Sequence, residues 1–241
     1  MTADPIVEVL SDRPALVDRA ADLVEAKIKQ AVKERGFCSL VLSGGSTPRP
    51  LYEELARRPL PLHQLHLFFG DERYVAPDHR DSNYRMVRLA WLEPAGFPIS
   101  NVHAMDTDAT EPAQAAEAHE LMLKRLLPDA ADGIPRFDIV LLGMGDDGHT
   151  ASLFPGTDAL GVSDRWVTVG YKGEEPRLTL TLPLLNQARN VMFLVAGTSK
   201  QPALAQVFSE TADGKAFPAK LIQPVGELRW LMDRQAGQNF E

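Results

Sequence analysis

The most informative stretch of the sequence is Asp138-Ile-Val-Leu-Leu-Gly-Met-Gly-Asp-Asp-Gly-His-Thr-Ala-Ser-Leu-Phe-Pro155, in which an apolar run ends abruptly in glycines, two carboxylates and one histidine. An apolar run bounded by glycines is typical of a strand in a mostly parallel sheet. Such sheets bind ligands at the carboxyl ends of their strands. The pattern therefore predicts an α/β fold in which His149 lies in an active-site loop.

The glycines of this loop also match two nucleotide-binding patterns by letter. The spacing in residues 143–148 fits the dinucleotide fingerprint, but Asp146 and Asp147 would repel a pyrophosphate, and Pro155 limits the helix that must follow. A Walker loop requires a lysine at the position of His149. Both nucleotide-binding interpretations are therefore disfavoured.

Length and composition indicate one globular domain. The chain has 241 residues, of which 44% are hydrophobic, so it can bury a full core, and no break divides it. We therefore expect a single domain over residues 1–241. The formal net charge of -8 gives no global attraction to nucleic acid or to an anionic membrane. The expected partner is a small molecule, with no nucleic acid and no membrane.

The single cysteine and the amino-terminal residues bear on the compartment. Cys38 rules out a disulfide framework and lies in an apolar run, where a buried, inert thiol is expected. Residues 1–13 alternate polar and apolar side chains, without a basic segment leading into a long apolar stretch. These features predict a cytoplasmic protein without a signal peptide or a membrane span.

Apolar periodicity divides the chain into alternating helices and strands. Helices are predicted over residues 15–35, 50–57, 83–91 and 114–127, and strands over residues 37–42, 65–69, 137–142, 166–171 and 191–196. This alternation predicts a doubly wound, mostly parallel, Rossmann-like sheet with helices on both faces. Residues 94–112 are expected to form the loosest connector, residues 170–176 a mobile surface loop, and residues 226–236 a closing amphipathic helix.

A turn of small residues, Ser43-Gly44-Gly45-Ser46-Thr47-Pro48, follows the strand predicted over residues 37–42. Its backbone amides and hydroxyls can approach an anion at the start of the next helix, which predicts a phosphate cradle. The alternative is an ordinary turn in which Ser46 or Thr47 caps the helix. This segment alone leaves both interpretations open.

Charged side chains recur where later segments begin or end. Asp71, Glu72 and Arg73 follow the strand over residues 65–69 and occupy ligand positions, although a structural salt bridge between Arg73 and either carboxylate is the alternative. Arg177 begins another alternating segment, and Lys200 follows the last predicted strand. Singly, such cations are more often solvated surface charges. Together with the serine-rich turn they would bind one phosphate dianion.

As a set, these residues resemble the glucosamine-6-phosphate isomerase/6-phosphogluconolactonase family, and specifically its lactonase branch. The resemblance spans nearly the whole chain, through Ser43-Gly-Gly-Ser-Thr-Pro48, Gly70-Asp-Glu-Arg73-x-Val75, Asp81-Ser-Asn83-Tyr84, Gly143-Met-Gly-x-Asp147-Gly-His149-Thr-Ala-Ser-Leu-Phe-Pro155, Gly197-x-x-Lys200 and Pro218-Ala … Leu231-Met-Asp233. It implies hydrolysis of 6-phospho-D-glucono-1,5-lactone to 6-phospho-D-gluconate in the oxidative pentose phosphate pathway. It also implies that no metal or organic cofactor takes part.

Two positions favour the lactonase branch over the deaminase branch. The deaminase pattern has a glutamate five residues after its histidine, where this chain has Phe154. A neutral aromatic ring cannot assist the opening of an amino-sugar ring, whereas lactone hydrolysis has no such need. The deaminase pattern also has an aromatic residue at the position of Arg73. A glucosamine-6-phosphate deaminase/isomerase and a non-catalytic sugar-phosphate sensor remain the alternatives.

The resemblance, combined with side-chain chemistry, assigns expected roles. His149 is expected to act as general base on the attacking water, with Asp147 either orienting the imidazole or only shaping the loop. No Gly-x-Ser-x-Gly elbow is present for a serine nucleophile. The substrate and its phosphate are expected to contact Gly44, Gly45, Ser46, Thr47, Asp71, Arg73, Arg177 and Lys200. No metal site is expected, the other histidines (His63, His66, His79, His103 and His119) are expected at the surface or in packing roles, and we expect a monomer or a weak homodimer.

Overall fold

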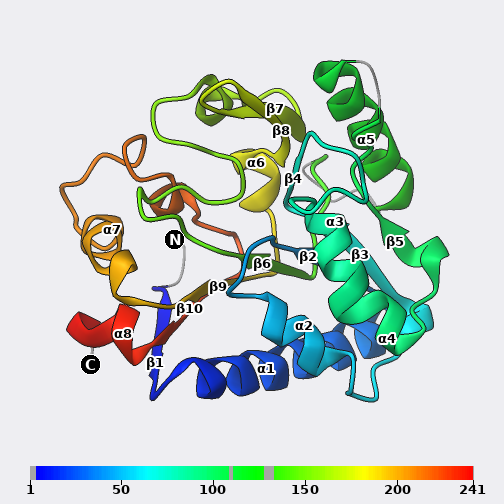
Figure 1. Cartoon of the computed structure of the whole chain (residues 1–241), viewed down its shortest axis with the longest axis horizontal. Helices are drawn as coiled ribbons and strands as arrows, with labels where there is room; N and C mark the ends of the chain where they lie inside the picture. The colour runs from blue at the N-terminus through cyan, green and yellow to red at the C-terminus, as the bar shows by residue number, and fades with distance from the viewer. Residues whose placement is uncertain (1–3, 109–110, 128–132, 241) are drawn as a thin grey trace.

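A parallel sheet forms the centre of the computed structural model, which describes residues 4–108, 111–127 and 133–240 (Figure 1). Its seven strands are ordered β1-β10-β9-β6-β2-β3-β5. Their bounds are β1 (Ile6–Leu10), β2 (Cys38–Leu42), β3 (Leu65–Phe69), β5 (Val102–His103), β6 (Ile139–Leu142), β9 (Asn190–Val195) and β10 (Glu227–Asp233). Each neighbouring pair is parallel. The predicted mostly parallel sheet is confirmed.

Helices cover both faces of this sheet (Figure 1). One face packs against α1 (Arg13–Arg35), α2 (Arg49–Leu55) and α3 (Asn83–Val87), which continues through a π-helical turn (Arg88–Leu92) into α4 (Glu93–Ala95). The other face packs against α5 (Pro112–Leu126), α6 (Leu182–Leu185), α7 (Gln201–Val207) and α8 (Arg234–Gly237). Short 3-10 turns cover Leu62–Gln64, Ile99–Asn101, Asp158–Gly161, Thr198–Lys200, Pro218–Leu221 and Gln238–Phe240. This is the predicted doubly wound arrangement.

The central strands are apolar on both faces because each face is covered. In β2, Leu40 and Leu42 belong to the core on the α1 side, while Val41 belongs to the opposite core. In β6, Ile139 and Val140 divide in the same way. This is why the strands of the parallel sheet appear in the sequence as uninterrupted apolar runs rather than as alternating patterns. Cys38 is a buried free thiol at the start of β2, as expected.

A second, antiparallel sheet lies outside the parallel one and corrects two expectations. It comprises β4 (Asp71–Arg73), β8 (Glu175–Leu180) and β7 (Val167–Lys172), in that order. The strand predicted over residues 166–171 therefore exists, but it does not join the parallel sheet. Residues 170–176 are not a free loop, because they form the β7–β8 hairpin with Gly173 at its turn (φ 61°). A glycine with positive φ is what a two-residue hairpin turn requires.

The tail is the other wrong prediction. Residues 227–233 form β10, an inner strand between β1 and β9, instead of part of an amphipathic helix. Trp230 and Met232 enter one core and Leu231 the other, as alternation in a strand demands. A short run that is apolar on both faces does not distinguish helix from strand by periodicity alone. Only Arg234–Gly237 is helical, and the Asp233 side chain caps this helix by accepting from Ala236 N.

Other boundaries agree with the expectations to within a few residues. Helix α1 ends at Gly36, which adopts φ 81°. The expected connector over residues 94–112 contains β5, and its residues 109 and 110 lie outside the described part of the chain. Strand β1 was not anticipated, although it lies in the alternating amino-terminal segment. No helix in the described ranges is both long and apolar enough to cross a membrane.

Candidate active site

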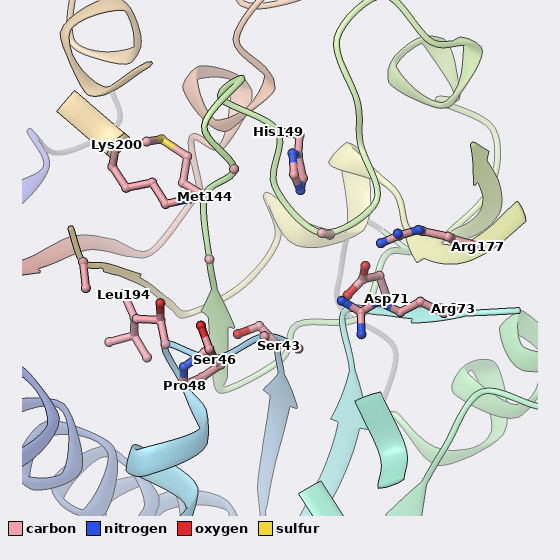
Figure 2. A pocket seen from close by; sticks show the side chains of 17 residues that line it. Ser43, Ser46, Pro48, Asp71, Arg73, Met144, His149, Arg177, Leu194 and Lys200 are labelled. Atoms are coloured by element: carbon pink, nitrogen blue, oxygen red, sulfur yellow. The ribbon is translucent and has the colours of Figure 1, made fainter. Parts of the chain in front are cut away.

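A cavity of about 250 Å³ lies beyond the carboxyl ends of β2, β6 and β9 (Figure 2). Its walls come from the turn over residues 43–48, the loop over residues 143–149, and the small antiparallel sheet. The predicted site residues that line it are Gly44, Gly45, Ser46, Thr47, Asp71, Arg73, His149, Arg177 and Lys200. The fold therefore brings segments that are far apart in sequence to one place, and Asp147 contacts the site through His149.

The imidazole of His149 is held from behind by Asp147. Oδ1 of Asp147 lies 2.6 Å from His149 Nδ1 and also accepts a 3.0 Å hydrogen bond from the His149 backbone amide. Partial burial alone would raise the pKa of Asp147, but the two hydrogen bonds from His149 lower that pKa below its ordinary value. An ionised Asp147 accepts a hydrogen bond from the Nδ1–H group of the neutral imidazole, which leaves Nε2 with its lone pair.

Glycine is required in this loop by the position of the ring. A Cβ atom at Gly145 would lie 2.0 Å from His149 Nδ1 and 2.6 Å from Asp147 Oδ1. The loop is closed by a hydrogen bond from Gly145 N to His149 O (2.9 Å) and by one from Thr150 Oγ1 to Gly143 O (2.8 Å). The glycines that resemble a nucleotide fingerprint thus make room for the His149–Asp147 pair.

Phe154 fills the position that is a glutamate in the deaminase pattern. Its ring packs against the His149 imidazole, and it is only 6% exposed. Arg177 Cζ lies 5.5 Å from the centroid of the same ring. The aromatic ring therefore contacts both the histidine and a cation, and it places apolar surface beside the imidazole.

Asp71 is a buried carboxylate with fixed orientation. Its Oδ2 accepts from Ser152 Oγ at 2.6 Å, and its Oδ1 and backbone carbonyl accept from Asn83 Nδ2 at 3.2 and 2.9 Å. Gly44 lies against Asn83, because a Cβ at Gly44 would be 1.8 Å from Asn83 Oδ1. Asp71 is thus linked to the Gly44 turn through one amide side chain.

Glu72 has a structural role at the start of α3. Its carboxylate accepts hydrogen bonds from the backbone amides of Asn83 and Tyr84, both at 2.7 Å, and from Ser82 Oγ at 3.1 Å. Burial raises the pKa of Glu72 despite these bonds. The guanidinium of Arg73 instead donates from Nη1 to the backbone carbonyl of Asp81 at 2.6 Å. The alternative of an Arg73–Glu72 salt bridge is not what the structure contains.

Arg73 and Arg177 form a pair of like charges at one side of the cavity. They face each other directly across the antiparallel β4–β8 pair. Burial, followed by the charge of Arg73, lowers the pKa of Arg177. Within the described residues, the Nε atoms of both arginines are buried without a hydrogen-bond partner. Two adjacent guanidinium groups with unused donors favour the binding of an anionic or strongly polar group.

Lys200 lies on the other side of the cavity from the two arginines (Figure 2). Its Nζ is 2.6 Å from Oδ1 of Asp146, and Ser199 Oγ donates to the same oxygen at 3.1 Å. The cations that were predicted to share one phosphate thus line two sides of the same cavity, which we call the two positive regions of the site. His149 lies above and between these regions in the view of Figure 2.

Several contacts of the site carried no local signal in the sequence. Ser152 and Asp71 are separated by 81 residues, and Asp146 and Ser199 by 53. Asn83 belongs to a recognised motif, but its contact with Gly44 depends on the fold. Within the described ranges, no group of three or more histidine, cysteine and carboxylate side chains is placed to hold a metal ion.

Comparison with known proteins places this site in a family. A sequence model described as "Glucosamine-6-phosphate isomerases/6-phosphogluconolactonase" matches residues 11–230. The chain belongs to this family. One member, a 6-phosphogluconolactonase of Synechocystis sp., is 54% identical over 236 residues, which make up 98% of each chain. The resemblance that the motifs indicated is confirmed.

Solved structures of the glucosamine-6-phosphate isomerase/6-phosphogluconolactonase family share the fold. A 6-phosphogluconolactonase from Trypanosoma brucei superimposes with a TM-score of 0.89 at 32% identity, covering 99% of both chains. A monomeric glucosamine-6-phosphate deaminase superimposes with a TM-score of 0.81 at 21% identity, covering 97% of this chain and 99% of that one. Both branches therefore have this architecture, so the side chains around His149 have to distinguish them.

Proposed function

We propose that this protein hydrolyses 6-phospho-D-glucono-1,5-lactone to 6-phospho-D-gluconate, in the oxidative pentose phosphate pathway. The observation that carries the proposal is the His149–Asp147 pair, with Phe154 packed beside it. This arrangement supplies one general base in an apolar setting and no carboxylate at the deaminase position. Two relatives that bear the name 6-phosphogluconolactonase, at 54% and 52% identity over nearly the whole chain, support the same substrate.

The proposed reaction begins with water held by His149 Nε2. As the water oxygen bonds to the lactone carbonyl carbon, Nε2 takes one of its protons, and Asp147 stabilises the imidazolium that forms. The carbonyl electrons move onto the oxygen, where Arg73 and Arg177 supply positively charged hydrogen-bond donors. When the bond from carbon to ring oxygen breaks, the ring oxygen leaves as an alcohol by taking the proton back from His149.

The substrate has two groups that need positive partners, the phosphate and the carbonyl that becomes a carboxylate. The site offers two positive regions, and Ser46 lies on the Lys200 side of the cavity in Figure 2. We therefore place the phosphate against Lys200 and the turn over residues 43–47, and the carbonyl toward Arg73 and Arg177. Anchoring the phosphate away from the reacting carbon holds the carbonyl near His149, which lowers the barrier by positioning.

Two variants test this placement. Lys200→Ala should raise KM for the phosphorylated lactone and leave kinetics on the unphosphorylated lactone little changed, whereas Arg73→Ala should impair both substrates. If Arg73→Ala alone loses the preference for the phosphorylated lactone, the phosphate lies at the arginines instead. If neither variant changes the kinetics, neither cation contacts the substrate.

The decisive experiment generates 6-phosphogluconolactone in situ and follows acid release against the rate without enzyme. Wild type should accelerate hydrolysis with a chelator present, and His149→Ala should lose turnover while still binding 6-phosphogluconate. Equal turnover by His149→Ala would remove His149 from the mechanism. Lack of acceleration by wild type would reject the proposed activity. Ammonia release from glucosamine 6-phosphate would then indicate a deaminase, and product binding without either reaction would indicate a sugar-phosphate sensor.

We further infer that residues 1–241 act as one domain, in the cytoplasm, as a monomer or a weak homodimer. The cavity supports the first inference, because both sheets contribute to its walls. Sedimentation velocity over a range of protein concentrations tests the oligomeric state. A tight dimer at nanomolar concentration would contradict it.

A further inference from the structure

Asp146 is the carboxylate of the His149 loop that the proposed reaction does not use. Its side chain is 64% exposed and does not line the cavity, yet its Oδ1 lies 2.6 Å from Nζ of Lys200. Lys200 is only 20% exposed and does line the cavity. The lysine thus faces the cavity while its ammonium group is paired with a residue outside the cavity wall.

The partners of Asp146 are the groups that a phosphate oxygen would seek. Oδ1 accepts from Ser199 Oγ at 3.1 Å in addition to its contact with Lys200. These bonds, led by the one from Lys200, lower the pKa of Asp146, so the carboxylate is ionised at neutral pH. A carboxylate oxygen that is bound by an ammonium and a hydroxyl has the same surroundings as an oxygen of a bound phosphate.

We propose that Asp146 competes with the phosphate of the substrate for Lys200. A phosphate dianion carries more charge than a carboxylate and can replace Asp146 on the ammonium group, whereas an unphosphorylated sugar cannot. The competition therefore makes release of the loop residue conditional on a phosphorylated ligand. Asp146 is a specificity-determining residue in this proposal, which rests on the placement of the phosphate at Lys200.

The competition also connects the phosphate end of the site to the imidazole. Asp146 is adjacent in sequence to Asp147, which holds His149 Nδ1 at 2.6 Å. When the phosphate takes Lys200, Asp146 is freed and repelled by the dianion. In this proposal, phosphate binding moves Asp146, and the movement is passed along the backbone to Asp147, which orients His149.

The test measures binding of inorganic phosphate by isothermal titration calorimetry to wild type and to Asp146→Asn. Exchange for the amide removes the competing charge with almost no change in shape. We expect Asp146→Asn to bind phosphate about two- to fivefold more tightly, the range expected for loss of one partly exposed competing charge. Asp164→Asn is the matched control, because Asp164 pairs with Arg165 (3.0 Å) outside the cavity.

A double-mutant cycle with Lys200→Ala distinguishes competition from a general effect of charge. The increase in phosphate affinity caused by Asp146→Asn should disappear when Lys200 is also replaced by alanine. The same increase in the Lys200→Ala background, or in Asp164→Asn, would overturn the proposal, as would unchanged phosphate affinity of Asp146→Asn. KM provides a second readout, since Asp146→Asn should lower it for the phosphorylated lactone.

The outcomes also separate this proposal from the proposed activity. Phosphate binding requires no turnover, so a wild type without lactonase activity would reject the activity and leave the calorimetric cycle valid. If wild type is an active lactonase and Lys200→Ala binds phosphate as well as wild type does, the competition is refuted and the activity stands.

Discussion

The ring of Phe154 packs against the imidazole of His149, with ring centroids 4.5 Å apart and planes inclined by 41°. This contact limits the orientations that the imidazole can adopt. We expect Phe154→Leu to lower kcat by about three- to tenfold, because an aromatic pair is worth about 0.5–1.5 kcal/mol, while KM changes less than kcat. Steady-state kinetics check this result. Phe97→Leu, at a buried phenylalanine in the core on the α1 side, is the control, and a change confined to KM would contradict the assigned role.

Because Arg73 and Arg177 are like charges that face each other, we expect that removing one of them weakens substrate binding without lowering the stability of the fold. Arg177→Met removes one of two like charges that face each other across two strands. We expect the free energy of unfolding to stay the same or to rise by about 0.5 kcal/mol, because like charges in opposed positions are destabilising. We expect kcat/KM to fall at least about tenfold, since a charged donor to the substrate is lost. Urea unfolding and kinetics measure the two effects, and a clear loss of stability without loss of kcat/KM would reverse the interpretation.

Asp147→Asn should impair turnover more than binding. Asparagine can present its amide group to Nδ1 and so favour the wrong tautomer of His149. We expect kcat to fall by at least about tenfold, whereas the dissociation constant of 6-phosphogluconate changes little. Calorimetry with 6-phosphogluconate measures this dissociation constant. A parallel loss of binding and turnover would indicate that the loop over residues 143–149 has collapsed.

The lowered pKa of Asp147 also determines a pH effect. Because the folded pKa lies below the unfolded value, the stabilising contribution of this carboxylate is complete above an unfolded pKa of about 3.9 and is lost as pH falls through the lower folded pKa. Asp147 therefore remains ionised between about pH 5 and 9. Because Asp147 contacts the His149 imidazole, the comparison is made without that ring: His149→Ala and the double variant His149→Ala/Asp147→Asn should have the same pH dependence of unfolding free energy within that interval. A difference in slope there would mean that Asp147 titrates in it.

Two histidines distant from the catalytic loop predict loss of stability on acidification. Burial lowers the pKa of His103 and of His119 to about 4 in each case, with the charges of His66 and His103, respectively, contributing. An unfolded histidine titrates near about 6.5, so between these values the unfolded chain binds protons that the folded chain does not. The free energy of unfolding should therefore decrease as pH falls from about 6.5 to 4, by up to about 1.4 kcal/mol per pH unit for each histidine.

Urea unfolding between pH 7 and 5 tests this pH dependence. His119→Leu should lose less stability than wild type over that interval, because it removes one of the histidines whose pKa is lowered by burial. His63→Leu, at an exposed position, should follow wild type. Identical pH dependence of wild type and His119→Leu would show that His119 is not the group responsible.

The sequence predicted β2, β3, β6 and β9 of the parallel sheet, because these strands are mostly apolar on both faces and are followed within two residues by a glycine. It failed for residues 227–233, where Trp230, Leu231 and Met232 are consecutive apolar residues that fit a helix or a buried strand equally. These residues form a strand because they lie between β1 and β9, and β1 is more than 200 positions away in the sequence. Residues 170–176 were misassigned because polar hairpin tips resemble free loops in composition.

The residues lining the site were predicted more fully than their arrangement. His149 and the small residues of the turn can be recognised in the sequence, because glycines and polar groups interrupt apolar runs at strand ends. The separation of Lys200 from Arg73 and Arg177 was not predictable, because the arginines belong to a sheet that the pattern of strands did not reveal. Hydrogen bonds such as Ser152 to Asp71 likewise exist only once that sheet has docked.

Because the candidate site is shared between two sheets, the site residues of one sheet can change while those of the other stay the same. His149 extends from the parallel sheet, whereas Arg73 and Arg177 belong to the antiparallel one. The tip of the β7–β8 hairpin, residues 171–175, is exposed, so its length and charge can change without altering the strands beside β6. Selection acting on that hairpin can therefore change which acyl group the enzyme accepts, while His149 and Asp147 stay the same. A library randomised in the hairpin is accordingly the natural starting point for directed evolution of substrate range.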